Sequence, residues 1–311
     1  MYDYITPKIV AAGELTTRRG YGVLGNGSSS RSEAIGGASL EELQERIDAF
    51  KSRDLETLTD SEMSEAVYDI MFGKTAQSIT FVKSMIPIHS GTSFFRARWL
   101  GDWKSQMRST DDVREPKPHY VERAGRLNTS GESILYTTLG TPATAVWECR
   151  FVKDDVFAMN RFVARGDFNA TVVGLDPLLP GLSGEDSQKL QIIQGFLAES
   201  FTYRVEPDYL EPYRLSRMLA LDFWHAPSRV SRAWAFSSIM DQTGQGWNVC
   251  FEPHVGQQAL LYKESHIYRI TRFDESDDRP VVELIAAFTG ARGDKLVQMS
   301  PQQLQGVQPW L

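Results

Sequence analysis

Residues 125–148 read GRLNTSGESILYTTLGTPATAVWE. The segment opens on a polar loop with a glycine at each end, Gly125 and Gly131, and this composition suits tight backbone turns. Residues 133–138 follow as a strand candidate, with Tyr136 near the centre of its apolar part. Because the loop leads into the strand, its cation, Arg126, and its amide, Asn128, are expected next to this ring.

A helix is expected directly after the strand, over residues 143–150. Thr141 is a good N-cap, and Pro142 suits the first helical position, where its missing N–H would have no partner in any case. The helix carries Glu148. Taken alone, the segment has two interpretations. It is either a functional site, or a hairpin and a helix whose Arg126 and Glu148 form surface ion pairs, which are common.

Two helices are expected before this segment, over residues 40–50 and 60–72, because apolar side chains recur there at helical spacing. Ser39 and Glu42 form a capping-box pattern at the start of the first helix. Residues 1–90 are therefore predicted to be a mainly helical N-terminal extension.

A larger domain is expected over residues 91–311. It opens on an aromatic-rich strand candidate at 93–99, which contains Arg96. Further helices are predicted at 187–199 and 213–226, and further strands at 157–163, 170–175, 247–251, 259–262, 266–272 and 281–287. Short strands grouped irregularly with helices favour an α+β fold over a doubly wound parallel sheet.

Composition excludes several classes of protein. The chain has 311 residues, of which 41% are apolar and 23% charged, as in soluble globular proteins. Its net charge of −7 disfavours a nucleic-acid-binding protein, which needs a basic face. We expect no membrane partner, because no apolar stretch is long enough to cross a bilayer and the N-terminus lacks an export-signal pattern. Two cysteines are too few for a disulfide framework, so a cytoplasmic protein is expected.

Other motifs have simpler interpretations. Gly20, Gly22 and Gly25 have the spacing of a dinucleotide-binding loop, but no hydrophobic strand precedes them and no helix signal follows, so a flexible loop is expected. The cysteines and histidines lack the paired spacing of metal ligands, and no metal is expected. The acidic run 274–278 lacks the glycine turn and distal glutamate of a calcium loop, which favours a solvated turn. No nucleophile elbow supports acyl transfer.

The residues of the central segment resemble the RES-domain family. That family is similar to the ADP-ribosyltransferases and degrades NAD⁺, commonly as the toxin of a bacterial toxin–antitoxin pair. The aromatic-Arg element of its opening strand is matched by Phe95-Arg96. Its loop, strand and helix patterns are matched by Gly125, Arg126, Asn128, Gly131, Leu135, Tyr136, Ala143, Ala145 and Glu148. The resemblance covers about residues 92–262, and it implies an ADP-ribosyltransferase-like split β-sheet core with surrounding helices.

The chain departs from the family in the third part of the pattern, where the family has a glycine-led strand followed by Tyr-Pro-Ser. The counterpart here, residues 246–253, reads GWNVCFEP and contains no serine. Cys250 or Glu252 takes that place, or the alignment is shifted. The identity of the third site residue is therefore left open.

The resemblance implies that NAD⁺ is the substrate, and each proposed catalytic residue has a matching chemical role. Arg96 would clamp the diphosphate bidentately, which a lysine does less well. Tyr136 would stack on the nicotinamide ring. Glu148 would accept a hydrogen bond from a ribose hydroxyl and stabilise the sugar cation that develops as nicotinamide leaves, as carboxylates do in glycoside cleavage.

Four further residues are candidates for binding NAD⁺: Gly125, Arg126, Asn128 and Glu252. Arg126 is a second candidate ligand for a phosphate or a ribose, whereas Asn128 is also explained as a residue that shapes the loop.

The acceptor that attacks the ribosyl cation decides the product, and the resemblance favours water or inorganic phosphate. The expected activity is therefore that of an NAD⁺ glycohydrolase or phosphorylase that acts as a growth-inhibiting toxin. Two alternatives stay open: an ADP-ribosyltransferase that modifies a macromolecule, and a non-catalytic NAD-binding module. The N-terminal helices would bind an antitoxin, drive homo-oligomer formation, or pack on their own catalytic domain.

Overall fold

The computed structural model describes residues 15–16, 38–72, 81–82, 84–174, 184–202, 211–220, 231–241, 246–274 and 280–311. Its main sheet contains β3 (Ser84–Ile88), β4 (Ser93–Leu100), β5 (Leu135–Leu139), β6 (Val156–Ala164), β7 (Phe168–Val172), β8 (Ala233–Ser237), β9 (Trp247–Phe251), β10 (Leu260–Phe273), β11 (Pro280–Arg292) and β12 (Lys295–Gln298). A separate pair joins β1 (Leu15–Thr16) to β2 (Phe81–Val82).

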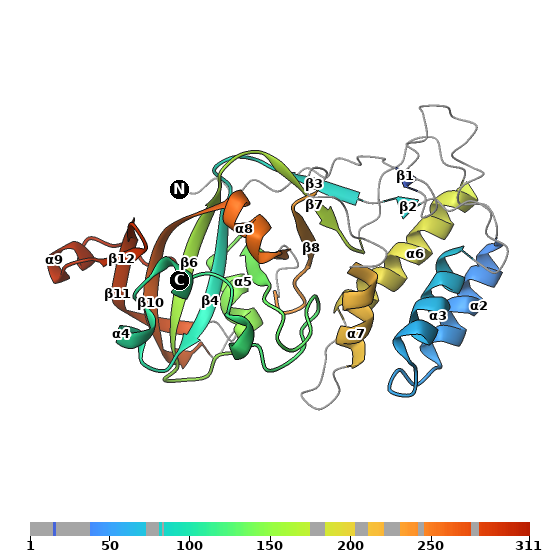
Figure 1. Ribbon diagram of the computed structural model, residues 1–311, viewed down its shortest axis with the longest axis horizontal. Coiled ribbons are helices and arrows are strands. Elements are labelled where there is room, and N and C mark those ends of the chain that lie inside the picture. The colour runs from blue at the N-terminus through green and yellow to red at the C-terminus, as the bar shows by residue number, and fades with distance from the viewer. Residues whose placement is uncertain are drawn as a thin grey trace.

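The helices are α2 (Leu40–Lys51), α3 (Asp60–Phe72), α4 (Trp103–Gln106), α5 (Pro142–Cys149), α6 (Gly184–Thr202), α7 (Glu211–Met218), α8 (Pro253–Ala259) and α9 (Pro301–Leu304). Two short 3₁₀ turns, η1 (Thr110–Asp112) and η2 (Pro118–Tyr120), lie between β4 and β5. The chain thus combines a large mixed sheet with several helices, and the prediction of an α+β fold is confirmed (Figure 1).

The ten strands of the main sheet follow the order β12-β11-β10-β6-β4-β5-β9-β8-β7-β3. Neighbours are antiparallel except β7 and β8, which are parallel. β4 pairs with β6 along its whole length, from Ser93 to Leu100. On its other side β4 pairs with β5 at two positions only, Phe94 with Leu139 and Phe95 with Thr138. The sheet therefore opens between β4 and β5 directly after Phe95.

The expected N-terminal helices share a hydrophobic core with the rest of the chain. Buried Leu43, Ile47 and Phe50 of α2 belong to the same cluster as Phe196 and Leu197 of α6. The ring of Phe50 meets that of Phe196 edge to face, with 5.5 Å between the centroids. Figure 1 shows α2 and α3 beside α6 and α7 at one end of the molecule. The apolar stripe of α2 is thus covered within the chain itself.

A second hydrophobic cluster forms the central core of the sheet. Phe94 and Phe162 are fully buried there with Phe251, and their cluster extends over both halves of the sheet. A third cluster packs α5 against β4, through contacts of Ala145 and Val146 with the face that carries Phe95. Helix α5 is therefore fixed against β4 where the sheet opens.

Most expected elements are found with shifted ends, and three differences matter for the site. The strands expected at 259–262 and 266–272 are one strand, β10. β3 and β8 were not expected, and β3 lies within the first ninety residues, which were predicted to be mainly helical. Gly20, Gly22, Gly25, residues 221–226 of an expected helix, and residues 275–278 of the acidic run lie outside the described residues. Within the described ranges, no helix has the length and hydrophobicity to span a bilayer.

Candidate active site

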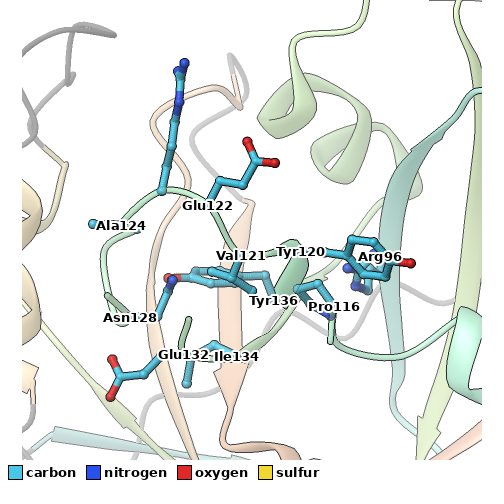
Figure 2. A pocket seen from close by; sticks show the side chains of 12 residues that line it. Arg96, Pro116, Tyr120, Val121, Glu122, Ala124, Asn128, Glu132, Ile134 and Tyr136 are labelled. Atoms are coloured by element: carbon cyan, nitrogen blue, oxygen red, sulfur yellow. The ribbon is translucent and has the colours of Figure 1, made fainter. Parts of the chain in front are cut away.

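A cavity of about 390 Å³ lies where β4 and β5 separate, and Figure 2 shows its walls. This volume is within the usual range for small-molecule sites. Its lining consists of Arg96 from β4, Tyr136 from β5 and residues of the intervening segment: Pro116, Tyr120, Val121, Glu122, Arg123, Ala124, Gly125, Asn128, Glu132 and Ile134. The opening of the sheet thus coincides with a cavity that contains four of the predicted site residues.

The ring of Tyr136 is held in the cavity wall by its hydroxyl. The hydroxyl donates to Asn128 Oδ1 at 3.1 Å and accepts from the backbone N–H of Leu127 at 3.0 Å. Burial raises the pKa of Tyr136 well above its ordinary value, so the hydroxyl stays protonated and keeps both hydrogen bonds. The Gly125 N–H donates to the Asn128 carbonyl at 2.9 Å and closes the turn that supplies both partners. The turn therefore fixes the ring.

Replacement of Gly125 by alanine should disturb this turn. A Cβ at this position would lie 2.7 Å from Asn128 Oδ1 and 3.1 Å from the hydroxyl of Tyr136. Something must therefore shift, and we expect a loss of about 1–3 kcal/mol in the free energy of unfolding, as overpacking typically costs. Gly195→Ala in α6 is the matched control, because nothing lies within 4 Å of its added Cβ and alanine favours the helix. Urea unfolding of both variants is the measurement, and equal stabilities would contradict the tight turn.

Arg96 brings a partly buried positive charge to the cavity. No hydrogen bond or ion pair holds its guanidinium among the described residues, and its Nε is buried without a partner. Burial, with a smaller contribution from the neighbouring charge of Arg98, lowers the pKa of Arg96 to about 10. The side chain is therefore still a cation at neutral pH. A desolvated cation that borders a cavity is stabilised by an anion that enters it.

Glu148 is held by two residues that the sequence did not point to. Its Oε1 accepts hydrogen bonds from Ser238 Oγ at 2.5 Å and from Asn248 Nδ2 at 2.8 Å. The Ser238 Oγ in turn accepts from the backbone N–H of Asp241 at 3.1 Å, which directs its own hydrogen towards Glu148. No hydrogen bond reaches Oε2 from the described residues. One oxygen is thus anchored and the other is available to a ligand.

Arg126 links Glu148 to the wall of the cavity. Its guanidinium carbon lies 5.4 Å from the ring centre of Tyr213 on α7, and its carbonyl accepts from Ser216 Oγ at 2.9 Å. Burial lowers the pKa of Arg126, while Tyr213 and the carboxylate of Glu148 act in the opposite direction. This coupling indicates that Arg126 lies within electrostatic reach of Glu148.

Cys250, a candidate for the third site residue, is a fully buried residue of β9. Burial and the charge of Glu148 raise the pKa of its thiol well above the ordinary value. A neutral buried thiol is a poor nucleophile. Its position opposite Tyr136 in the β5–β9 pair makes it part of the support for the ring.

Not all predicted site residues come together. Arg96, Gly125, Asn128 and Tyr136 line the cavity, whereas Arg126 and Glu148 are coupled to each other and are not part of its lining.

Glu252 lies apart from this group. It precedes α8, forms an ion pair with His254 at 3.6 Å and is not part of the cavity lining. Ser238 and Asn248 are the residues that sequence reasoning missed. Ser238 follows the apolar run AWAFS of β8, and this run is the sequence signal that could have placed it at a strand end.

No family model, curated protein or solved structure matches the chain. The resemblance to the RES-domain family therefore rests on the quoted residues alone. Among the residues that the structure describes, no group of three or more His, Cys, Asp or Glu side chains could hold a metal ion.

Proposed function

We propose that this chain binds NAD⁺ and cleaves its nicotinamide–ribose bond, on a fold similar to that of the ADP-ribosyltransferases. The observation that carries the proposal is the arrangement of Glu148, whose Oε1 is fixed by Ser238 and Asn248 while Oε2 has no hydrogen bond from the described residues. The separation of β4 from β5 after Phe95 supports the split-sheet part of the proposal.

The chemistry requires stabilisation of a positive charge. As the C–N bond breaks, nicotinamide leaves as a neutral molecule with the bonding electron pair, and the ribose becomes a cation. Glu148 accepts a hydrogen bond from a ribose hydroxyl through Oε2 and places its negative charge beside this cation. Ser238 and Asn248 prevent the carboxylate from rotating away, so no reorganisation is needed during the reaction.

Arg96 and Tyr136 position the two ends of the reacting half of the substrate. The unpartnered guanidinium of Arg96 takes the diphosphate, and the held ring of Tyr136 stacks on the nicotinamide. Arg126, coupled to Glu148, is a second ligand for a phosphate or a ribose hydroxyl.

The acceptor completes the reaction. Attack of water on the anomeric carbon, with loss of a proton, gives ADP-ribose, and attack of inorganic phosphate gives ADP-ribose phosphate. Loss of NAD⁺ by either route would stop growth, so we propose a toxin that acts in the cytoplasm and is controlled by an antitoxin.

Incubation of the purified protein with NAD⁺, with and without phosphate, tests the proposal by release of nicotinamide and by product masses. We expect ADP-ribose, or ADP-ribose phosphate when phosphate is present. If labelled NAD⁺ leaves its label on a macromolecule in a lysate, the activity is ADP-ribosyl transfer instead. Binding of NAD⁺ without nicotinamide release under every condition would establish a non-catalytic module and overturn the proposal.

A further inference from the structure

Tyr120 is a large aromatic side chain that the fold leaves uncovered. It ends the η2 turn, lines the cavity and is 67% exposed. Its hydroxyl makes no hydrogen bond with the described residues. Since the ring neither packs in the core nor bonds through its hydroxyl, the fold itself gives no reason for a tyrosine at this position.

The turn fixes the backbone that carries the ring. The backbone N–H of Tyr120 donates to the Lys117 carbonyl at 2.9 Å, and the next N–H, of Val121, donates to the Pro118 carbonyl at 3.0 Å. The His119 ring lies 4.1 Å from the Tyr120 ring, centre to centre. A tyrosine has only two side-chain torsions, so an exposed ring on a fixed turn loses little conformational entropy when a flat ligand stacks on it.

The lining of the cavity carries charges of both signs. Its cations are Arg96 and the exposed Arg123, and its acidic residues are Glu122 and Glu132. Glu132 is paired with Arg217, whereas Arg96 has no ion pair among the described residues and can therefore attract a diphosphate. In the view of Figure 2, Tyr136 lies between Asn128 on one side and Arg96 with Tyr120 on the other. Arg96, Tyr120 and Tyr136 line the same cavity, so a molecule that binds at Tyr136 and Arg96 lies in the cavity that Tyr120 borders.

We propose that Tyr120 is the stacking platform for the adenine ring of NAD⁺. This inference rests on the proposed function, in which nicotinamide lies at Tyr136 and the diphosphate at Arg96. Adenine follows the diphosphate in the substrate, and a purine has the flat aromatic face that stacks on a tyrosine. The subsite gives the enzyme its preference for a dinucleotide over a mononucleotide.

The test compares NAD⁺ with nicotinamide mononucleotide, which has the same scissile bond but lacks the adenylate. Tyr120→Ala should raise KM for NAD⁺ by about fivefold or more, the effect of losing one base–aromatic stack, and leave kcat within about twofold. The same variant should treat the mononucleotide as the parent does. Tyr120→Phe keeps the ring and should behave as the parent with both substrates.

AMP inhibition provides the second measurement, because AMP carries the adenine without the scissile bond. Its inhibition constant should rise in Tyr120→Ala by the same factor as KM for NAD⁺. Equal losses with both substrates, or no change in either KM for NAD⁺ or AMP inhibition, would overturn the adenine platform while the proposed function stands. A parent protein that releases no nicotinamide from NAD⁺ would instead overturn the proposed function, and the platform with it.

Discussion

Replacement of Glu148 by glutamine is expected to lower kcat for nicotinamide release by about 10²–10³, the usual cost of removing one preorganised charge-stabilising group. The amide keeps an oxygen that accepts from Ser238 and Asn248, so its orientation is retained. It loses the negative charge that faces the ribosyl cation. KM should change little, since the charge matters most in the transition state.

The control is Glu283→Gln on β11, which removes a carboxylate from an exposed ion pair with Arg269. Such pairs contribute little to stability, and this variant should retain the parent rate. Thermal unfolding of both variants confirms that they are folded. A Glu148→Gln protein with the parent kcat would show that the carboxylate has no part in the reaction.

The local parts of the fold could be predicted from the sequence. The Ser39–Glu42 pattern indeed caps α2, with the Glu42 N–H donating to Ser39 Oγ at 3.1 Å. The helix expected over 60–72 is α3, and the strand expected over 247–251 is β9. Capping, helical periodicity and runs of β-formers act within a few residues, so they can be recognised without the rest of the chain.

The long strand β10 could not be predicted in one piece because polar residues interrupt its apolar pattern. Glu264 forms an ion pair with Arg161 of β6 at 2.8 Å, and Ser265 Oγ donates to Asn160 Oδ1 at 2.7 Å. These side chains are satisfied by a strand about a hundred residues earlier in the chain. Only the pairing of β10 with β6 makes them compatible with a strand interior.

The candidate site also has a local part that could be predicted from the sequence and a part that depends on distant strands. The turn that binds the Tyr136 hydroxyl lies within one segment, and its glycine and asparagine could be recognised there. The anchoring of Glu148 by Ser238 and Asn248 depends instead on how β8 and β9 pair with β5. The gap that exposes Arg96 arises because β5 pairs with β4 at two positions only. Neither feature has a local sequence pattern.

Replacement of Arg96 by lysine is expected to lower kcat/KM for NAD⁺ by about 10–100-fold, the range for loss of one charge-assisted hydrogen bond at about 1.5–3 kcal/mol. The guanidinium is planar and offers paired donors to a diphosphate, whereas an ammonium is a point charge. Arg269→Lys, in the exposed ion pair on β10, is the matched control and should keep the parent value.

The loss of kcat/KM in Arg96→Lys should increase with pH, because burial lowers the pKa of either an arginine or a lysine at this position. It lowers the pKa of Arg96 to about 10, so the parent remains charged, and its kcat/KM should stay level, from pH 7 to about 9. A lysine starts from an ordinary pKa of about 10.4, and the same burial lowers it further, so it loses its proton within this range. Once this lysine is deprotonated, it no longer attracts the diphosphate, so kcat/KM of Arg96→Lys should fall as pH rises. Profiles of Arg96→Lys and parent that remain parallel from pH 7 to 9 would mean that the charge at this position does not bind the substrate.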